Sequence, residues 1–318
     1  MATTLNCRRT TKRDLRRAGD LSTDDVEVIF ELASVFKAAR ERGEPNAALR
    51  GKALALIFEK PSLRTRSTFE LGMVQLGGHA VYLAPQEIGL GRRETPRDIA
   101  RNIERWFDLV AARTFLQATI DELADHCRLP VINALSDEEH PCQALADYLT
   151  LREHFGSGEG RRLTYLGDGN NICHSLITLG ARLGHHLTVC TPRGYEPRPD
   201  IVRTAQADLK RSGGSLHWTD DPAAAVARAE VIYTDVWTSM GQEAEQEARR
   251  RVFEPYQVNA ALVAKAPRGA LIMHDLPARR GEEITDEILD GPHCLAFDQA
   301  ENRLHAQKGV LAFLSGLA

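Results

Sequence analysis

Short apolar runs alternate with amphipathic runs along almost the whole chain, and this alternation limits the possible folds more than any other feature. Each apolar run has the length of a single buried strand, and most amphipathic runs have helical spacing. The runs expected as strands are 53–58, 79–83, 109–113, 130–134, 163–167, 187–191, 215–219, 231–234 and 270–273. Strand–helix alternation is typical of a mostly parallel sheet with helices on both faces. The sequence therefore predicts an α/β fold.

A glycine-rich segment, Gly156-Ser157-Gly158-Glu159-Gly160, divides the alternation into two sets and is the best linker candidate. A chain of 318 residues agrees with about two domains. We expect a first domain at 1–150, a second at 151–298, and a last helix at about 299–318. Ligands of open α/β sheets bind at the carboxyl ends of the strands. The active site is therefore expected in the cleft between the domains.

Local signals place several helices between the strands. Ser22-Thr23-Asp24-Asp25 has the pattern of a capping box that opens a helix. Thr119 is expected to cap a helix that runs through His126, and proline in the first turn favours a helix from His140 to about Phe155. The other helices expected are 63–76, 92–105, 171–183, 199–212, 222–229 and 299–317.

Composition excludes several classes of function. With 43% hydrophobic and 26% charged residues and a net charge of −4, the chain gives no sign of binding nucleic acid or an anionic membrane surface. No apolar run approaches the ~20 residues of a membrane span. The first 17 residues are basic but lack the apolar core of a secretory signal.

The cysteines indicate a reducing compartment. None of the six forms a C-x-x-C pair, and no histidine cluster has zinc spacing, so we expect reduced thiols, a cytoplasmic protein and no metal. They are Cys7, Cys127, Cys142, Cys173, Cys190 and Cys294.

The segment from Ser62 to Arg66 lies where an expected strand, 53–58, turns into an expected helix. The first N–H groups of a helix have no backbone partner, and the helix dipole is positive there. Two hydroxyls and two guanidiniums at such a position favour a phosphate dianion. An N-capping serine with solvated arginines is the structural alternative.

Other polar residues also follow expected strands. His140 and Gln143 share one face of a helix start and are either a buried capping pair or ligands for a carbonyl and an amide. Cys142 is more typical of a small buried residue than of a nucleophile. Asp235, with Ser239 and Met240, is either an N-cap or a site for an α-ammonium group. In Gly167-Asp168-Gly169-Asn170-Asn171-Ile172 the third glycine of a dinucleotide fingerprint is missing, which disfavours a nicotinamide cofactor.

Five stretches in order resemble the aspartate/ornithine carbamoyltransferase family. They are FEKPSLRTRSTFELGMVQLGGHAVYL, HPCQALADYLTL, YLGDGNNICHSL, DVWTSMGQE and FDQAENRLHAQK. DVWTSMG resembles the ornithine enzymes rather than the aspartate enzymes. The resemblance implies transfer of the carbamoyl group of carbamoyl phosphate to the δ-amine of L-ornithine, without a cofactor. It also implies a homotrimer, or a multiple of trimers, and a last helix that packs back on the first domain.

The resemblance also implies a role for each site residue. Ser62, Leu63 (through its N–H), Arg64 and Thr65 would hold the phosphate. The carbamoyl end would contact Arg113, His140, Gln143, the backbone of Asp275 and Leu276, and Arg303. The amino-acid end of ornithine would contact Asn171, Asp235, Ser239 and Met240. Arg113, His140, Asp275 and Arg303 are the catalytic candidates.

Three positions depart from the family pattern. Leu63 replaces a threonine but keeps its N–H, so phosphate binding should survive. Gly89 stands where some relatives have a glutamine that reaches into the neighbouring site. Asp275 replaces a cysteine that lies beside the reacting amine in the family. An ionised Asp275 would repel the phosphate dianion, act as a general base, or recognise a different amine.

These departures leave two further hypotheses open. One is a carbamoyltransferase for a related amine, for which Asp275 is the only sign. The other is a weakly active paralogue that serves as a binding or regulatory subunit. The intact Arg64, Arg113, His140 and Arg303 argue against the second of these.

Overall fold

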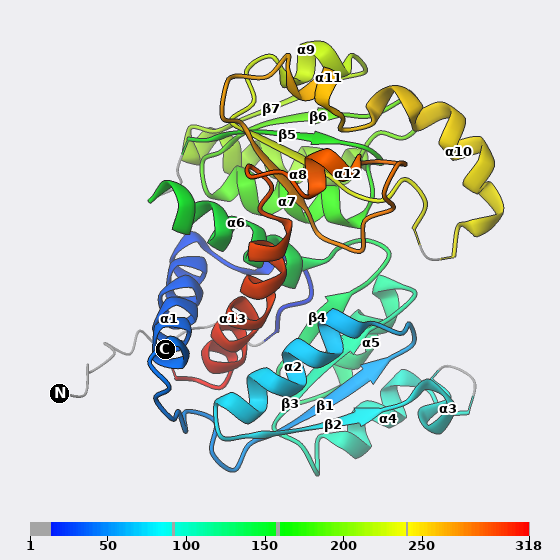
Figure 1. Cartoon of the computed structure of the whole chain (residues 1–318). Helices are drawn as coiled ribbons and strands as arrows, with labels where there is room; N and C mark the ends of the chain where they lie inside the picture. Colours follow the sequence, from blue (N-terminus) through cyan, green and yellow to red (C-terminus); the bar gives the residue numbers. More distant parts are fainter. Residues whose placement is uncertain (1–13, 91–92, 157–159, 240, 318) are drawn as a thin grey trace. The chain divides into compact units, whose positions relative to one another are not determined.

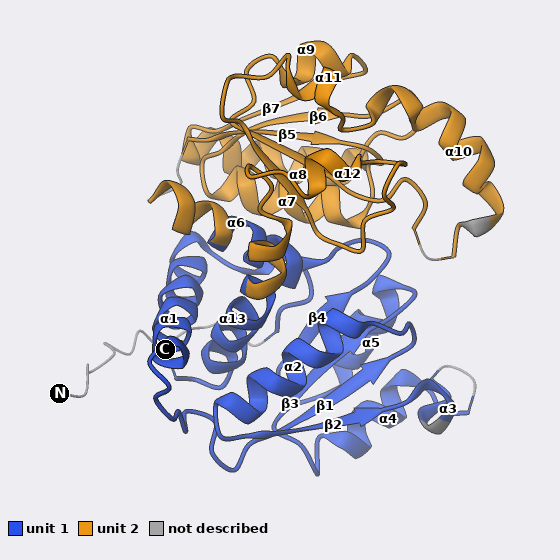
Figure 2. Ribbon diagram, viewed as in Figure 1, with its two compact units in different colours: residues 1–149, 302–318 blue, residues 150–301 orange. Residues whose placement is uncertain are grey.

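The computed structural model describes residues 14–90, 93–156, 160–239 and 241–317 (Figure 1). The chain divides into two compact units (Figure 2). Unit 1 comprises residues 1–149 and 302–318, and unit 2 comprises residues 150–301. The chain passes from unit 1 to unit 2 within helix α6 and returns within helix α13. Both units are α/β in character.

Unit 1 is built on a four-stranded parallel sheet in the order β2-β1-β3-β4. The strands are β1 (Ala53–Phe58), β2 (His79–Leu83), β3 (Leu109–Arg113) and β4 (Val131–Leu135). The helices are α1 (Thr23–Glu41), α2 (Leu63–Gln75), α3 (Pro85–Ile88), α4 (Pro96–Ile103), α5 (Gln117–His126), α6 (Pro141–Phe155) and α13 (Ala296–Leu314), after a 3-10 turn at Ala18–Asp20. The strand order reverses between β1 and β3, which makes their carboxyl ends the switch point of this sheet.

Unit 2 has a five-stranded parallel sheet in the order β7-β6-β5-β8-β9. Its strands are β5 (Arg162–Leu166), β6 (His186–Cys190), β7 (Ser215–Thr219), β8 (Val231–Thr234) and β9 (Leu271–His274). Its helices are α7 (Asn171–Arg182), α8 (Pro199–Ser212), α9 (Pro222–Val226), α10 (Gln246–Phe253), α11 (Ala260–Val263) and α12 (Asp286–Leu289), with 3-10 turns at Glu243–Glu245 and Glu254–Tyr256. Here the order reverses between β5 and β8, and this switch point is where a ligand is expected.

The two tandem parallel-sheet domains predicted from the sequence are confirmed. Every expected strand is present within one residue of its expected ends. The capping box at Ser22 is also confirmed, because Ser22 accepts from the Asp25 N–H and Asp25 accepts from the Ser22 N–H. The remaining element boundaries differ in a few places.

The expected cap at Thr119 is wrong. Helix α5 starts at Gln117, and the Gln117 N–H donates to the Asp137 carboxylate at 2.6 Å, so a residue distant in sequence caps this helix. The expected helix 92–105 is shorter: α4 starts after Thr95, whose hydroxyl accepts from the Asp98 N–H. The short α3 and the strongly charged α10 were not expected.

Helix α13 packs in unit 1 at very close range. Gly309 lies against α1, where an added Cβ would come 2.5 Å from the Ile29 carbonyl oxygen and 3.2 Å from Ile29 Cγ2. Lys37 donates to Asn302 Oδ1 at 2.9 Å, and the nearly buried Lys308 donates to Gln75 Oε1 at 3.1 Å. These contacts fix the helix that carries Arg303.

Replacing Gly309 by alanine should destabilise unit 1 by about 1–3 kcal/mol, because overpacking forces the backbones of α1 and α13 apart. Gly72→Ala in α2 is a matched control, since its Cβ would meet Lys308 Cγ at an ordinary 3.4 Å. That variant should be neutral or gain up to about 1 kcal/mol from helix propensity. Denaturant unfolding of both variants checks this, and equal stabilities would contradict the close approach.

Candidate functional site

The turn after β1 leads into the N-terminus of helix α2. Ser62 is the N-cap of α2, in extended conformation, and its hydroxyl accepts from the Thr65 N–H at 3.2 Å. Leu63 is 78% exposed, so its side chain is not part of the core. The N–H groups at this end of α2 therefore lie at the carboxyl end of β1, where the sheet order reverses.

The two arginines of this turn differ in surroundings. Arg66 donates to Glu70 Oε1 at 2.9 Å, and its guanidinium lies 3.8 Å from the centre of the Tyr82 ring. Arg64 is half-buried and precedes the buried Thr65. Residues two apart on a helix lie about 200° apart around its axis, so Arg64 faces a different side from Arg66.

Three buried side chains from distant parts of unit 1 meet at this turn. Arg113 ends β3 and donates from Nη1 to Thr65 Oγ1 at 3.5 Å. Arg303, from α13, donates from Nη2 to Thr65 Oγ1 at 3.0 Å and from Nη1 to Gln143 Oε1. All of these side chains are at most 8% exposed. Two guanidiniums thus converge on one threonine hydroxyl beside a helix N-terminus.

Asp147 orients the amide of Gln143. Gln143 Nε2 donates to Asp147 Oδ1 at 2.7 Å, which fixes the amide so that its oxygen faces Arg303. Asp147 is fully buried and lies four residues further along α6, at the i, i+4 spacing that puts two side chains on one helix face. Sequence reasoning did not single out Asp147, although this spacing was available as a signal.

His140 and Cys142 are both buried at the start of α6. Burial lowers the pKa of His140 well below 6.5, and the charges of Arg303 and Arg113 lower it further. His140 is therefore a neutral imidazole at pH 7. Burial raises the pKa of Cys142 to about 12, and its Sγ contacts the Asn133 carbonyl at 3.5 Å. Cys142 is thus a buried thiol with little tendency to form a thiolate.

In unit 2, carboxyl groups follow two neighbouring strands. Thr234 and His274 are register partners in β8 and β9, so Asp235 and Asp275 follow at adjacent places on the same sheet edge. Asp235 Oδ2 accepts from Asn170 Nδ2 at 2.8 Å, and Oδ1 accepts from the Val236 N–H at 2.6 Å. Both aspartates lie at or next to the switch point of this sheet.

Asn170 and Asn171 have different roles at the start of α7. Asn170 is the N-cap, and its Oδ1 accepts from the N–H groups of Ile172 and Cys173. Its amide nitrogen contacts Asp235. Asn171, the residue expected in the site, is the first residue of the helix and is half-buried. Asn170 was not in the expected set, although the N-cap position signals it.

A side chain of helix α10 holds the loop after Asp235 in place. Arg249 Nη1 donates to Asp168 Oδ2 and to the Trp237 carbonyl, both at 2.9 Å. The Ser239 N–H donates to Gln242 Oε1 at 3.1 Å. Met240 lies outside the described residues. The buried Arg249 therefore fixes the segment that leads to Ser239.

The turn after β9 is held by His274. Its Nδ1 accepts from the Leu276 N–H at 2.9 Å, and its Nε2 lies 3.0 Å from Glu283 Oε1. Leu276 has a φ of 56°, which non-glycine residues adopt only when their surroundings impose it. The His274–Glu283 pair is fully buried and defines how Asp275 and Leu276 leave the sheet.

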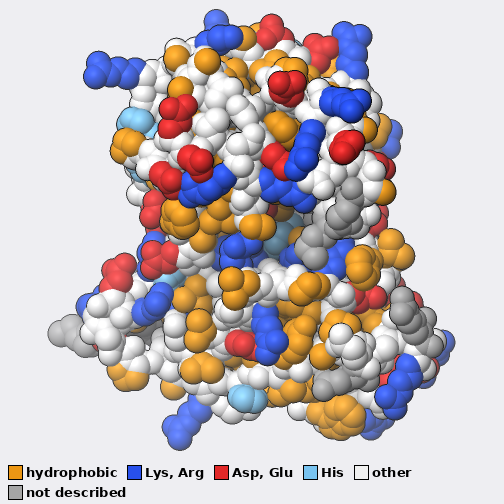
Figure 3. Space-filling view, turned by 45° about the vertical axis from the view of Figure 1, so that its right-hand side comes forward, with side chains coloured by type: hydrophobic (Ala, Val, Ile, Leu, Met, Phe, Trp, Pro, Cys, Tyr) orange, Lys and Arg blue, Asp and Glu red, His pale blue; other side chains and the backbone are white. Residues whose placement is uncertain are grey.

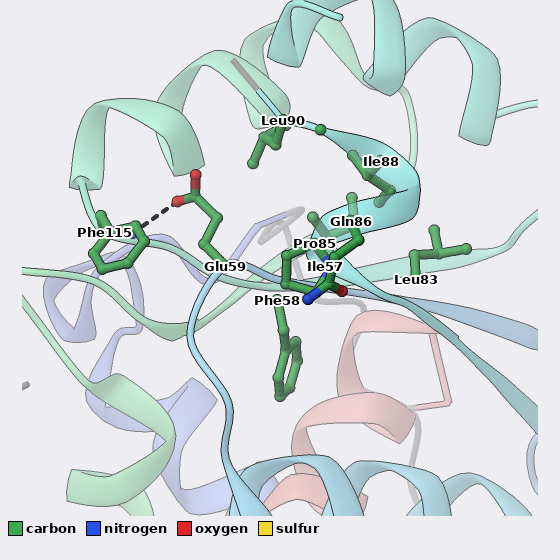
Figure 4. Close-up of a pocket in the computed structure, with 10 residues that line it drawn as sticks. Ile57, Phe58, Glu59, Leu83, Pro85, Gln86, Ile88, Leu90 and Phe115 are labelled. Carbon is green, nitrogen blue, oxygen red and sulfur yellow. Dashed lines mark hydrogen bonds between the residues drawn. The ribbon is translucent and has the colours of Figure 1, made fainter. Parts of the chain in front are cut away.

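A separate cavity of about 360 Å³ lies in unit 1 between the ends of β1 and β2 and helix α3 (Figure 4). Its lining is mostly apolar and includes Gly89, and the Glu59 carboxylate there accepts from the Phe115 N–H at 2.8 Å. None of the residues expected to bind substrate lines it. This cavity is therefore not the candidate site.

No group of three or more His, Cys, Asp or Glu side chains suited to a metal ion occurs among the described residues. In the same residues, no helix is long and apolar enough to cross a membrane. The five described cysteines are free thiols, and Cys7 lies outside the described residues. On the face seen in Figure 3, basic and acidic side chains are interspersed.

Two family models match consecutive parts of the chain. The carbamoyl-P binding domain of aspartate/ornithine carbamoyltransferase matches residues 13–153, and the Asp/Orn binding domain matches residues 159–314. The chain belongs to the aspartate/ornithine carbamoyltransferase family. The site residues that converge in each unit fall within the corresponding family domain, apart from Arg303, which lies in the region matched by the second model but in unit 1.

Relatives in this family place the chain near the ornithine enzymes. It is 50% identical to an ornithine carbamoyltransferase of Pyrococcus horikoshii, with 96% of each chain covered. The solved ornithine carbamoyltransferase of Pyrococcus furiosus is 49% identical with a TM-score of 0.93, covering 96% of this chain and 98% of that one. A solved variant of N-acetyl-L-ornithine transcarbamylase is 32% identical with a TM-score of 0.86, covering 95% and 99%.

Proposed function

We propose that the protein transfers the carbamoyl group of carbamoyl phosphate to the δ-amine of L-ornithine and forms L-citrulline and phosphate. The observation that carries this proposal is the convergence of Arg113 and Arg303 on Thr65 at the N-terminus of α2. Two guanidiniums, a hydroxyl and the first N–H groups of a helix match a phosphate dianion. The ornithine carbamoyltransferases at about half identity over nearly the full chain support the acceptor.

In the proposed site of unit 1, Ser62, Leu63 (through its N–H), Arg64 and Thr65 hold the phosphate. Arg113, His140, Gln143 and Arg303 contact the carbamoyl end. In unit 2, the backbone of Asp275 and Leu276 is proposed for the same end of the substrate, as the family resemblance implies. Because burial and two cations keep His140 neutral, it can donate one hydrogen bond to the carbonyl oxygen without repelling the arginines. Donors fixed before the reaction stabilise the oxyanion that forms there.

Unit 2 is proposed to hold the amino acid. Asp235 takes the α-ammonium group, and Asn171, Ser239 and Met240 contribute to the same amino-acid end. The description of the matching family domain as Asp/Orn binding supports this assignment. The neutral δ-amine then attacks the carbamoyl carbon, the bond to the phosphate oxygen breaks, and phosphate leaves. Positioning of two substrates supplies most of the acceleration.

Steady-state citrulline formation from carbamoyl phosphate and L-ornithine tests the proposal. We expect kcat/KM of about 10⁴ M⁻¹s⁻¹ or above, the ordinary range of enzymes. A panel of other acceptors should be assayed beside L-ornithine, namely L-lysine, putrescine, L-aspartate and N-acetyl-L-ornithine. Carbamoyl-phosphate binding without turnover of any amine would overturn the assignment and favour a binding or regulatory subunit.

Asp275 favours one second candidate, a carbamoyltransferase for a different amine. A second buried carboxyl beside Asp235 suits an acceptor with two ammonium groups, which ornithine also has. It disfavours N-acetyl-L-ornithine, whose α-nitrogen carries no charge and would leave Asp235 buried without a cation. Higher kcat/KM for another amine in the panel would select this candidate.

We also propose a homotrimer, or a multiple of trimers, in the cytoplasm. The family resemblance supports this assembly, and light scattering on the purified protein tests it.

A further inference from the structure

Three neighbouring strands of unit 2, β5, β6 and β7, carry polar side chains on one face near their amino ends. Because side chains alternate between the two faces of a strand, and register partners share a face, these residues all point to the same side of the sheet. They form two rows across it: Arg162, His186 and Ser215, then Thr164, Thr188 and His217. The rows lie at the end of the sheet opposite to its switch point.

The same face becomes apolar towards the carboxyl ends of the strands. Leu166 and Cys190 belong there to the core cluster that includes residues of α9. On the opposite face, Leu163, Tyr165 and Val189 are buried. Strands of a parallel sheet are normally apolar on both faces, since helices cover both. Core packing therefore gives no reason for the two polar rows.

A cavity of about 300 Å³ lies over the polar rows. Its lining consists of these six residues together with Leu187, Ala225 and Arg228. Figure 1 shows α9 and α11 on one side of this sheet and α7 and α8 on the other. Helix α9 is short, with 5 residues, and the Thr164 hydroxyl fixes it to the sheet by donating to the Ala225 carbonyl at 2.9 Å. The segment after this helix adds Arg228 to the cavity.

The lining of this cavity carries positive charge and no negative charge. Arg162 and Arg228 are exposed, and neither guanidinium forms an ion pair or a hydrogen bond with another described residue. No aspartate or glutamate belongs to the lining. Nearby, Glu230 accepts from the backbone N–H of Arg162 at 2.9 Å and from Arg161 Nη1 at 3.1 Å. The two guanidiniums of the lining therefore remain available to an anion.

Hydroxyl and imidazole groups add further donors to the two guanidiniums. His186 Nδ1 and Ser215 Oγ are hydrogen-bonded at 3.0 Å, and Nε2 of this ring bonds to no described residue. Thr188 is half-buried, and its hydroxyl forms no hydrogen bond with another described side chain or backbone group. Planar guanidinium forks match the geometry of phosphate oxygens. A phosphate group has enough oxygens for all of these donors, whereas a carboxylate has two.

We propose that this cavity of unit 2 binds a phosphate group, either free or as the monoester of a small organic molecule. Arg162 and Arg228 pair with its oxygens, and the side chains of Thr188 and His186 donate to it. About 300 Å³ is at the lower end of ligand pockets, so a phosphate with a short organic group fits. The proposal goes beyond the proposed function and does not rest on it, because none of these residues belongs to the proposed active site.

Calorimetry with inorganic phosphate and with glycerol 3-phosphate tests the proposal. The background is Arg64→Ala, which weakens the proposed phosphate site of unit 1. We expect this variant to keep saturable binding of one phosphate per chain. Adding Arg162→Gln or Arg228→Gln should weaken that binding by about 10- to 10²-fold, because each removes a charge-assisted hydrogen bond. Tighter binding of glycerol 3-phosphate supports a monoester as the ligand, and tighter binding of phosphate supports the free ion.

Arg161→Gln in the same background is the matched control, because it removes an equal charge one residue earlier. Arg161 is already paired with Glu230, and its guanidinium lies 4.4 Å from the centre of the Phe155 ring. Its phosphate affinity should stay within about threefold of the Arg64→Ala background, since a charge without direct contact is screened by salt. Equal losses in Arg161→Gln and Arg162→Gln would overturn the proposal. Absence of saturable binding at millimolar phosphate in Arg64→Ala would also overturn it.

Histidine resonances locate the bound phosphate. The ring signals of His186 and His217 should shift in NMR spectra as phosphate is added, and these shifts should vanish in Arg162→Gln. The variants His186→Asn and His217→Asn identify the two signals. Phosphate-dependent shifts at His140 without any at His186 or His217 would place the binding in unit 1 alone and contradict the site.

Steady-state kinetics separates this site from the proposed function. In phosphate-free buffer, Arg162→Gln should form citrulline with kcat/KM within about twofold of the wild type, because it removes no group from the proposed active site. A fall in kcat/KM as large as the loss of phosphate affinity would assign Arg162 to the active site and overturn a second site. Wild-type protein that binds phosphate in unit 2 but forms no citrulline would overturn the proposed function alone.

Discussion

Replacing Arg303 by alanine is expected to lower kcat/KM for carbamoyl phosphate by about 10³-fold or more. Arg303 is 3% exposed and reaches both Thr65 Oγ1 and Gln143 Oε1. Its removal takes away one cation of the proposed phosphate site and leaves the Gln143 oxygen buried without that donor. Loss of one preorganised donor alone costs about 10²- to 10³-fold, and the lost charge adds to this.

Arg303→Lys separates charge from geometry. Lysine keeps the charge but cannot reach two acceptors with a planar fork, so its loss should be smaller than that of the alanine variant. Steady-state kinetics with carbamoyl phosphate measures both variants, and denaturant unfolding checks that α13 remains folded. Activity of Arg303→Ala within tenfold of the wild type would remove Arg303 from the proposed site.

The same substitution has a second readout in unit 1. Because the charge of Arg303 lowers the pKa of His140, Arg303→Ala should raise the His140 pKa, although burial and Arg113 still hold it below 6.5. Titration of the histidine resonances by NMR measures this shift. A His140 pKa that does not move would mean that Arg303 is not close to the imidazole in solution.

Elements of the fold could be predicted from the sequence where the residues that stabilise them are close together in the chain. Apolar runs of strand length gave the strands within one residue, because buried parallel strands read as continuous apolar segments. Ser22 gave the start of α1 because its cap partner is three residues away. Thr119 failed because Asp137, far along the chain, satisfies the first N–H of α5.

The site was less accessible from single segments. The turn at residues 62–66 could be proposed as an anion site from its own residues. The contact between Arg303 and Thr65 joins residues 238 positions apart, and no periodicity in either segment indicates it. Only the family resemblance supplied Arg303. Asp275 shows the reverse case. The resemblance predicts a cysteine there, and only the parallel register of β8 and β9 shows that Asp275 and Asp235 follow neighbouring strands.

Replacing Arg64 by alanine is the second substitution with a large expected effect. It should weaken carbamoyl-phosphate binding by about 10- to 10²-fold and leave the fold intact. A charge-assisted hydrogen bond contributes about 1.5–3 kcal/mol, and each 1.4 kcal/mol is tenfold in affinity. Calorimetry with inorganic phosphate as the probe measures the binding step without turnover.

Arg66→Ala is the matched control, because it removes the same guanidinium from the same helix turn. Arg66 is already engaged by Glu70 and by the Tyr82 ring. The side chains of the pair with Glu70 are 46% and 35% exposed, so loss of this pair costs little stability. Phosphate affinity of Arg66→Ala should stay within about threefold of the wild type, since an exposed charge that does not contact the phosphate is screened by salt.

Equal losses in the two variants would indicate that the turn attracts phosphate only through its net charge. An unchanged affinity in Arg64→Ala would place the anion site elsewhere. A large loss confined to Arg64→Ala would instead require that the Arg64 guanidinium contacts the phosphate directly.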